Sequence, residues 1–175
     1  MMRAETSTLV LIDFQAKLRP AIDQATATIA SARRLVDAAR LVGAPILFTE
    51  QNPKGLGPTV ADLAPDPSAI VPKMTFGAVG APGFFERLEP GRDAVVGGWE
   101  AHVCVMQTVL ALIEAGRRVF VVSDAVGSRR PESKDIALRR MARSGADIVT
   151  MEMVVFEWLQ SAEHPRFKEA MALIK

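Results

Sequence analysis

The sequence predicts a single α/β domain, built on an open, mainly parallel sheet of five to six strands. Short apolar runs of strand length alternate with longer segments of helical period, which is the pattern of parallel strands joined by crossover helices. The chain has 175 residues, which is enough for one hydrophobic core, and no composition shift indicates a second domain. We therefore expect residues 1–175 to form one three-layer αβα sandwich.

The elements of the N-terminal half follow from apolar runs and the residues that stop them. The first strand is expected at Thr8–Ile12, a nearly continuous buried run. A helix is predicted over about 25–42, with Gly43 placed to end it. The second strand is expected at Ala44–Thr49. Residues 50–72 are rich in Pro, Gly and Asn and predict an irregular connection with one short helical turn and a brief third strand.

The C-terminal half continues the same alternation. Apolar runs mark its strands, and glycines stop its first two helices. The expected elements are a strand at 94–98, a helix at about 102–115, a strand at 118–122, a helix at about 132–144, a strand at 148–150, and a helical stretch from 154 that is broken at Pro165. The sequence contains no internal repeat and no low-complexity segment.

Charge and composition exclude several classes of partner. The 21 Lys and Arg residues balance 20 Asp and Glu, so a net charge of +1 gives no reason to expect nucleic acid or an anionic membrane. A small-molecule substrate is expected instead. The single cysteine and the absence of an apolar N-terminal segment predict a reducing cytoplasm. The apolar runs are too short to cross a bilayer, so we expect a soluble protein.

Topology predicts where the chemistry lies. Ligands of open parallel sheets bind beyond the carboxyl ends of the strands, where successive strands run outward in opposite directions. Asp13 follows the first strand, and the fourth strand leads into a segment that ends at Cys104. A carboxylate and a thiol are thus expected at one crevice. Cys104 is also expected in the first turn of a helix, where the dipole and free N–H groups favour a thiolate and lower the pKa.

Each candidate residue has a structural alternative. A lone cysteine such as Cys104 is often a small buried hydrophobe, and Asp13 can accept hydrogen bonds from a turn. A loop lysine such as Lys73 is usually a solvated charge. If Lys73 points inward, it pairs with Asp13 and favours the Cys104 thiolate.

With these positions in place, the chain resembles the isochorismatase-like cysteine hydrolases over essentially its whole length. The matching stretches are Leu9 to Gln15, Lys73 followed by Phe76, Gly97 to Val105 with Thr108 one turn further, and Arg118 to Ala125. The likeness is closer to the subgroup called isochorismatase domain-containing proteins. It rests on Thr49 to Val60, on Glu100-Ala101, and on His164 to Glu169. The resemblance implies the sheet order 3-2-1-4-5-6.

The resemblance also implies the catalytic machinery. It predicts a triad of Asp13, Lys73 and Cys104, with a cis peptide between Trp99 and Glu100. The N–H groups of Glu100 and Cys104 would then point at one spot and form an oxyanion hole. Asp13 would take the thiol proton, Cys104 would attack a substrate carbonyl, and water would hydrolyse the thioester acyl-enzyme. The expected activity is amidase-type or related acyl hydrolysis.

Departures from the family narrow this activity. Nicotinamidases of the superfamily bind a metal through an aspartate and two histidines in the loop after the second strand, and residues 50–53 contain no histidine. The two histidines, His102 and His164, lie in different segments, so we expect no metal and no other cofactor. True isochorismatases lack the nucleophilic cysteine. Cys104 therefore argues against the reaction that gives the family its name.

Six residues near the triad are expected to line the substrate pocket: Phe14, Gln15, Glu50, Phe76, Trp99 and His102. Apolar walls are typical of small-molecule sites, and we expect Phe76 and Trp99 to be walls rather than core, with neither favoured for Phe14. His102 is expected to be a polar residue at a helix start that lies near enough to touch substrate. Glu100 either offers a second carboxylate for a cationic or hydrogen-bond-donating substrate or turns to solvent or to another subunit.

The leading hypothesis is a metal-independent cysteine hydrolase. The alternative is a catalytically silent ligand-binding or interaction protein on the same fold, which has no need of all three triad residues. A thiol-based redox protein is disfavoured because no second cysteine could resolve a disulfide. Exposed apolar positions expected on the C-terminal helices predict a homo-oligomer, a dimer or larger.

Overall fold

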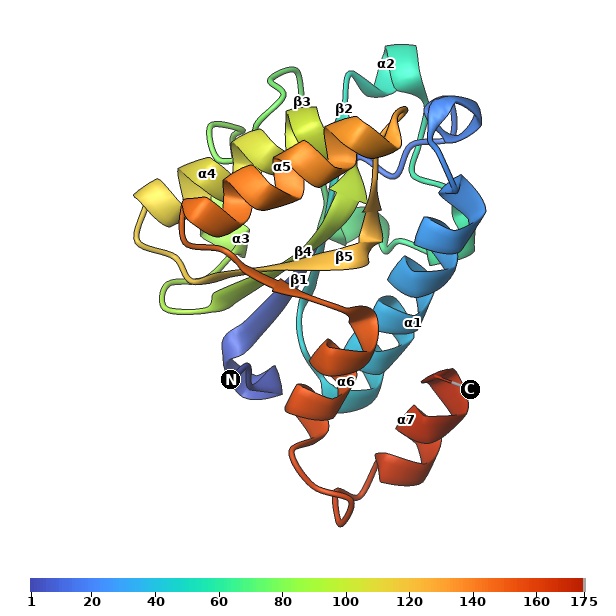
Figure 1. Cartoon of the computed structure of the whole chain (residues 1–175), viewed down its shortest axis with the longest axis vertical. Coiled ribbons are helices and arrows are strands. Elements are labelled where there is room, and N and C mark those ends of the chain that lie inside the picture. Colours follow the sequence, from blue (N-terminus) through green and yellow to red (C-terminus); the bar gives the residue numbers. More distant parts are fainter. Residues whose placement is uncertain (175) are drawn as a thin grey trace.

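The computed structural model describes residues 1–174 and places a six-stranded parallel sheet between two layers of helices (Figure 1). The strand order is β3-β2-β1-β4-β5-β6, which confirms the predicted fold class and order. The strands are β1 (Ser7–Ile12), β2 (Ile46–Gln51), β3 (Ile70–Lys73), β4 (Asp93–Trp99), β5 (Val119–Gly127) and β6 (Asp147–Val149).

Seven α-helices are present in the part of the chain that the structure describes. They are α1 (Ala25–Val42), α2 (Pro53–Leu56), α3 (Phe84–Arg87), α4 (Met106–Glu114), α5 (Pro131–Arg143), α6 (Met151–Leu159) and α7 (Phe167–Ile174). A π-helical segment, η5 (Ala101–Val105), leads into α4. Single 3₁₀ turns are η1 (Ala4–Thr6), η2 (Arg19–Ala21), η3 (Ala61–Leu63) and η4 (Pro67–Ala69).

The central strands are buried on both faces, which explains their nearly continuous apolar sequences. Along β1, Leu9 and Leu11 pack against the α1 side of the sheet, while Val10 and Ile12 pack on the α4 side. Helices α1 and α6 cover the first face, with α7 packed against them, and α4 and α5 lie together over the second (Figure 1). Because successive strand residues point to opposite faces, one strand supplies both halves of the core.

The strand β5 is longer than the predicted 118–122, because it contains a bulge opposite β4. Val96 pairs with Val121, but Gly98 pairs with Val126, so the intervening residues of β5 face Gly97 alone. A Cβ at Gly97 would lie 3.1 Å from the Ala125 carbonyl oxygen. The glycine therefore permits the close approach of the two strands beside the bulge.

Other boundaries also differ from the predictions. The strand β2 runs on to Gln51, into the expected irregular connection, because Glu50 and Gln51 pair with β3. The helix α6 begins at Met151 rather than 154, since the Thr150 side chain accepts a hydrogen bond from the Met153 N–H. It ends at Leu159, with the next residue in the left-handed region, and not at Pro165. Within residues 1–174, no helix is both long and apolar enough to cross a membrane.

Candidate active site

Asp13 lies directly after β1 at the carboxyl edge of the sheet, in a left-handed conformation with φ 51°. Its Oδ2 is 2.7 Å from Lys73 Nζ, and both side chains are 0% exposed. The hydroxyl of Thr49 donates to the other oxygen, Oδ1, at 2.6 Å. Because β1, β2 and β3 are neighbours in parallel, their carboxyl ends bring Asp13, Thr49 and Lys73 together. The inward orientation of Lys73 excludes the alternative of a solvated loop lysine.

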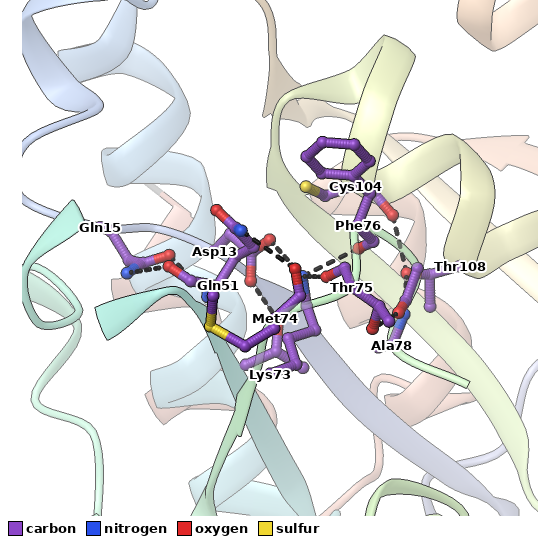
Figure 2. A network of polar contacts seen from close by, with 12 residues as sticks. Asp13, Gln15, Gln51, Lys73, Met74, Thr75, Phe76, Ala78, Cys104 and Thr108 are labelled. Carbon is purple, nitrogen blue, oxygen red and sulfur yellow. Dashed lines mark hydrogen bonds and ion pairs between the residues drawn. The ribbon is translucent and has the colours of Figure 1, made fainter. Parts of the chain in front are cut away.

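The Lys73 ammonium uses all of its donors within the protein. Besides Asp13, it donates to the carbonyl oxygens of Thr75 at 3.1 Å and of Phe76 at 2.8 Å (Figure 2). An ammonium has three N–H groups, so none is left for a ligand in this arrangement. Lys73 therefore acts on the site through its charge and its hold on Asp13.

Cys104 lies in η5, just before α4, and is 8% exposed. The pKa of its thiol is raised to about 12, first by burial and then by the negative charge of Asp13. The charge of Lys73 opposes this rise, and a hydrogen bond to Asp13 and the charge of Glu100 contribute smaller increases within the same total. The prediction that the helix start lowers the pKa of Cys104 is therefore wrong. Burial and the carboxylates of Asp13 and Glu100 favour the neutral thiol more than the Lys73 ammonium and the helix dipole favour the thiolate.

Two residues expected in the pocket instead hold the loop after β2. Gln15 donates to the carbonyl oxygens of Gln51 and Gly57 and accepts from the Gln51 N–H. The Glu50 carboxylate accepts from both the N–H and the hydroxyl of Thr59. These contacts use the polar atoms of Gln15 and one oxygen of Glu50, so the structure assigns them to loop positioning.

The three aromatic candidates lie in different environments. Trp99 is fully buried, with its ring 4.9 Å from that of Phe14 and its indole N–H donated to Thr28. The expected pocket wall at Trp99 is therefore core, because the pleat of β4 turns this residue, like Val95, to the α1 side. Phe14 is also core. Phe76 is 53% exposed, which is compatible with a place at the rim of the site.

A second polar cluster surrounds Glu100, in the segment that leads to Cys104. The peptide between Trp99 and Glu100 is cis. The Glu100 carboxylate is 11% exposed, with Oε1 2.7 Å from Arg129 Nε and Oε2 3.5 Å from His102 Nδ1. His102 Nδ1 also lies 3.0 Å from the Ser128 hydroxyl. The carboxylate thus turns to Arg129 and His102 rather than to solvent, and its Oε2 has no hydrogen-bond partner within residues 1–174.

Two cavities adjoin these groups. One of about 630 Å³ lies beside Lys73, and one of about 440 Å³ lies beside His102. The first is lined by Asn52, Pro53, Lys54, Pro72, Lys73, Met74, Thr75, Gly80, Ala81 and Pro82. The second is lined by His102, Arg129, Arg130 and Ser133.

No group of three or more His, Cys, Asp or Glu side chains in residues 1–174 is arranged to hold a metal ion. His164, the second histidine, lies in the C-terminal loop, where its ring accepts a hydrogen bond from the Arg166 N–H. The two histidines are thus engaged in separate parts of the fold.

Three residues that contact the site had no role predicted from the sequence. Thr49 lies in β2, beside the strand that leads to Asp13, and a hydroxyl near the end of that strand was a usable signal. Thr108 was a motif match without a function. Arg129 had no local signal, because its approach to Glu100 depends on how α5 packs beside η5.

The chain is similar to known proteins over nearly its whole length. The family model described as Isochorismatase domain matches residues 7–153. Isochorismatase domain-containing protein 2A of Mus musculus is 39% identical over 98% of this chain and 84% of its own length. The family model runs from the start of β1 into the first residues of α6 and thus covers every candidate site residue.

Solved structures of similar proteins share the fold of this chain over nearly its whole length. The MAR1 ribonuclease of Caenorhabditis elegans superposes with a TM-score of 0.94 at 36% identity, covering 99% of this chain and 91% of that one. The YcaC gene product of Escherichia coli, described as an octameric hydrolase of unknown specificity, has a TM-score of 0.87 at 24% identity, covering 98% and 94%. At that identity the second likeness bears on the fold alone.

Proposed function

The chain belongs to the isochorismatase family, and we propose that it is a metal-independent cysteine hydrolase of a small amide or related acyl compound. One observation carries the proposal. The Asp13 carboxylate is buried in an ion pair with Lys73 and also acts on the Cys104 thiol. A buried base, a cation and a protonated nucleophile in one place are the groups that acyl transfer through a thioester requires.

In the proposed first step, Asp13 takes the proton of Cys104 as the sulfur attacks the substrate carbonyl carbon. Because the pKa of the thiol is about 12, proton transfer accompanies attack and no stable thiolate precedes it. The carbonyl electron pair moves to oxygen, which the N–H groups of Glu100 and Cys104 are proposed to stabilise. The intermediate then expels the leaving group, which receives the proton from Asp13.

The second step returns the enzyme to its starting state. Asp13 removes a proton from water, the resulting hydroxide attacks the thioester carbonyl, and the carbon–sulfur bond breaks. The acid product leaves, and the sulfur of Cys104 regains its proton. Lys73 stabilises the charged form of Asp13 before each proton transfer and keeps the carboxyl group in place, since the Lys73 N–H groups are all bound to protein oxygens.

The partly exposed side chains near the triad are the proposed substrate contacts. Phe76 offers an apolar ring at the rim. His102 is partly exposed and adjoins a cavity. An apolar wall with a few polar groups suits a small acyl compound.

The test is acylation by 4-nitrophenyl acetate and turnover of a panel of short-chain amides. We expect intact-protein mass to gain one acetyl group on Cys104, and the Cys104→Ala variant to show neither the adduct nor turnover. An Asp13→Asn variant is expected to hydrolyse its adduct more slowly than wild type. A folded protein that gives no adduct and no turnover with any probe would support the alternative of a catalytically silent binding protein.

RNA is a second candidate substrate, because the relative with a TM-score of 0.94 is called a MAR1 ribonuclease. The near-zero net charge is not typical of RNA-binding proteins. A labelled oligoribonucleotide incubated with wild type and Cys104→Ala separates the two candidates. Cleavage by both proteins would assign RNA hydrolysis to another site, and cleavage by wild type alone would make RNA the substrate of this one.

We also propose that the protein is a homo-oligomer. Met153 and Phe156 on α6 are 46% and 43% exposed, and a relative of the same fold is described as octameric. Large exposed apolar side chains on one helix are typical of subunit contacts. Light scattering after size-exclusion chromatography would show a mass above 18.9 kDa, and a monomer would refute this. The cytoplasmic location stays a prediction.

A further inference from the structure

The loop of residues 75–78 connects the two halves of the candidate site. Its carbonyl groups at Thr75 and Phe76 accept two of the three Lys73 hydrogen bonds. Its other end contacts α4, where the Ala78 N–H donates to the Thr108 hydroxyl at 3.0 Å. The position of the Lys73 ammonium therefore depends on where this loop is held.

Thr108 holds the loop to the nucleophile helix. Its hydroxyl accepts from Ala78 and donates to the carbonyl oxygen of Cys104 at 2.7 Å, and the whole residue is 0% exposed (Figure 2). One hydroxyl group thus bonds at the same time to the loop that orients Lys73 and to the backbone of Cys104. A hydroxyl can do both because it has one donor and two acceptor positions.

The loop lies directly against the helix at this point. A Cβ added at Gly77 would be 3.5 Å from the Cβ of Gln107, which is ordinary contact distance. A buried backbone N–H such as that of Ala78 needs a partner, and Thr108 supplies the one that the structure gives it. Without the hydroxyl, the loop would lose its polar attachment to α4.

Resting on the proposed hydrolase function, we propose that Thr108 is a positioning residue, which sets the distance between the Lys73 ammonium and the Cys104 sulfur through the 75–78 loop. Threonines in helices often donate to the carbonyl four residues earlier, and that bond alone would serve only local structure. The bond from Ala78 is different, because it comes from the loop that carries the two carbonyl acceptors of Lys73. Thr108 touches no reacting atom.

Alkylation of Cys104 by iodoacetamide tests the proposed role of Thr108 without any substrate. The chain has one cysteine, so intact mass reports that residue alone. Thr108→Val keeps the shape and removes the hydroxyl, whereas Thr108→Ser keeps the hydroxyl. If Lys73 moves away, the pKa of the thiol rises, so we expect Thr108→Val to be alkylated about tenfold more slowly in mildly alkaline buffer, for a change of about one pKa unit. Thr108→Ser is expected to stay within about threefold of wild type on the same scale.

A second background shows whether the effect passes through Lys73. In the double variant Asp13→Asn with Lys73→Met, both buried charges are absent, and adding Thr108→Val is then expected to leave the alkylation rate unchanged. An equal slowing in both backgrounds would overturn the proposal, because it would mean that Thr108 acts on Cys104 directly. Gln107→Ala, a change at the exposed neighbouring residue, is the matched control and is expected to match wild type.

Stability and function are separated by the same set of variants. Thr108→Val is expected to lower the melting temperature whether or not the proposal holds, so a lower melting temperature with a wild-type alkylation profile would refute it. If Thr108→Val does not fold, Thr108→Ala removes the same hydroxyl and replaces it in the test. Failure of the hydrolase function would appear separately, as the absence of an acyl adduct on Cys104 in wild type.

Discussion

Two carboxylates act on Cys104, and they are held in different ways. Asp13 is fully buried, and each of its oxygens has a donor, Lys73 or Thr49. Glu100 is paired with Arg129, whose side chain is 60% exposed, and one of its oxygens has no hydrogen-bond partner in the described residues 1–174. Both carboxylates raise the pKa of the thiol, Asp13 more than Glu100.

The negative charge of Asp13 is therefore fixed in the interior, whereas that of Glu100 depends on a partner at the surface. The ion pair of Asp13 and Lys73 is shielded from water and salt, and removal of either partner leaves an isolated buried charge. The pair of Glu100 and Arg129 reaches solvent, so it is screened and weaker. We therefore expect changes on the Asp13 side to have large effects and matched changes on the Glu100 side to have small ones.

The largest effect is expected from Asp13→Asn. Loss of the general base should lower kcat by about 10²–10⁴-fold. The same change removes the negative charge that raises the thiol pKa and leaves Lys73, which lowers it, so the pKa of Cys104 should fall and iodoacetamide alkylation should become faster. Turnover and alkylation thus move in opposite directions. The matched Glu100→Gln variant should speed alkylation far less and should change turnover far less, because its side chain has no part in the proposed proton transfers; equal effects would break the comparison.

Lys73→Met should strongly lower the free energy of unfolding. It leaves the buried Asp13 carboxylate without its counter-ion, which costs about 3–5 kcal/mol in the free energy of unfolding. Urea denaturation measures the loss. Combining Lys73→Met with Asp13→Asn removes both charges and should recover part of this stability, whereas additive losses would show that the pair is not coupled.

Cys104→Ser should change how stability depends on pH. The folded protein keeps the Cys104 thiol proton up to about pH 12, whereas the thiol of the unfolded chain ionises at its ordinary pKa of 9.0. Ionisation of the unfolded chain therefore lowers the stability of the fold as pH rises from about 9 toward 12, and has no effect below about pH 9. In that window wild type should lose about 1.4 kcal/mol more stability per pH unit than Cys104→Ser, which has no thiol to titrate. Urea unfolding at several alkaline pH values tests this, and parallel curves would mean that the thiol pKa is not raised.

Arg129→Gln should have the smallest effect. An exposed partner contributes about 0–1 kcal/mol, and salt should reduce the difference from wild type further. Thermal unfolding at low and high salt measures both. A loss as large as that of Lys73→Met would show that Glu100 is held as tightly as Asp13, contrary to the distinction drawn between the two sides.

The sequence predicted the sheet and most of its strands because apolar runs of strand length have few alternatives in a chain of this size. It did not predict the long β5 or the start of α6. The first depends on a bulge at Gly97 that only pairing reveals, and the second on a single Thr150 cap. Local pattern gives the type of an element more reliably than its ends.

The site residues were also predicted only in part. Asp13 and Cys104 were predicted at one crevice because strand topology alone brings strand ends together. Gln15 and Glu50 were expected in the pocket, yet they bind the loop after β2, and Trp99 lies in the core. These differences arise because a side chain's partners belong to distant segments, which a sequence pattern does not contain.

The fold class, the family and the order of the chemical groups along the chain follow from the sequence, because periodicity and motif are enough to define them. The contacts and the protonation of those groups depend on the tertiary structure. Packing buries Cys104 beside two carboxylates and raises its pKa, and it encloses Lys73 in three protein oxygens. Desolvation and charge act through space, so the protonation of a site depends on what folds around it and not on its neighbours in sequence.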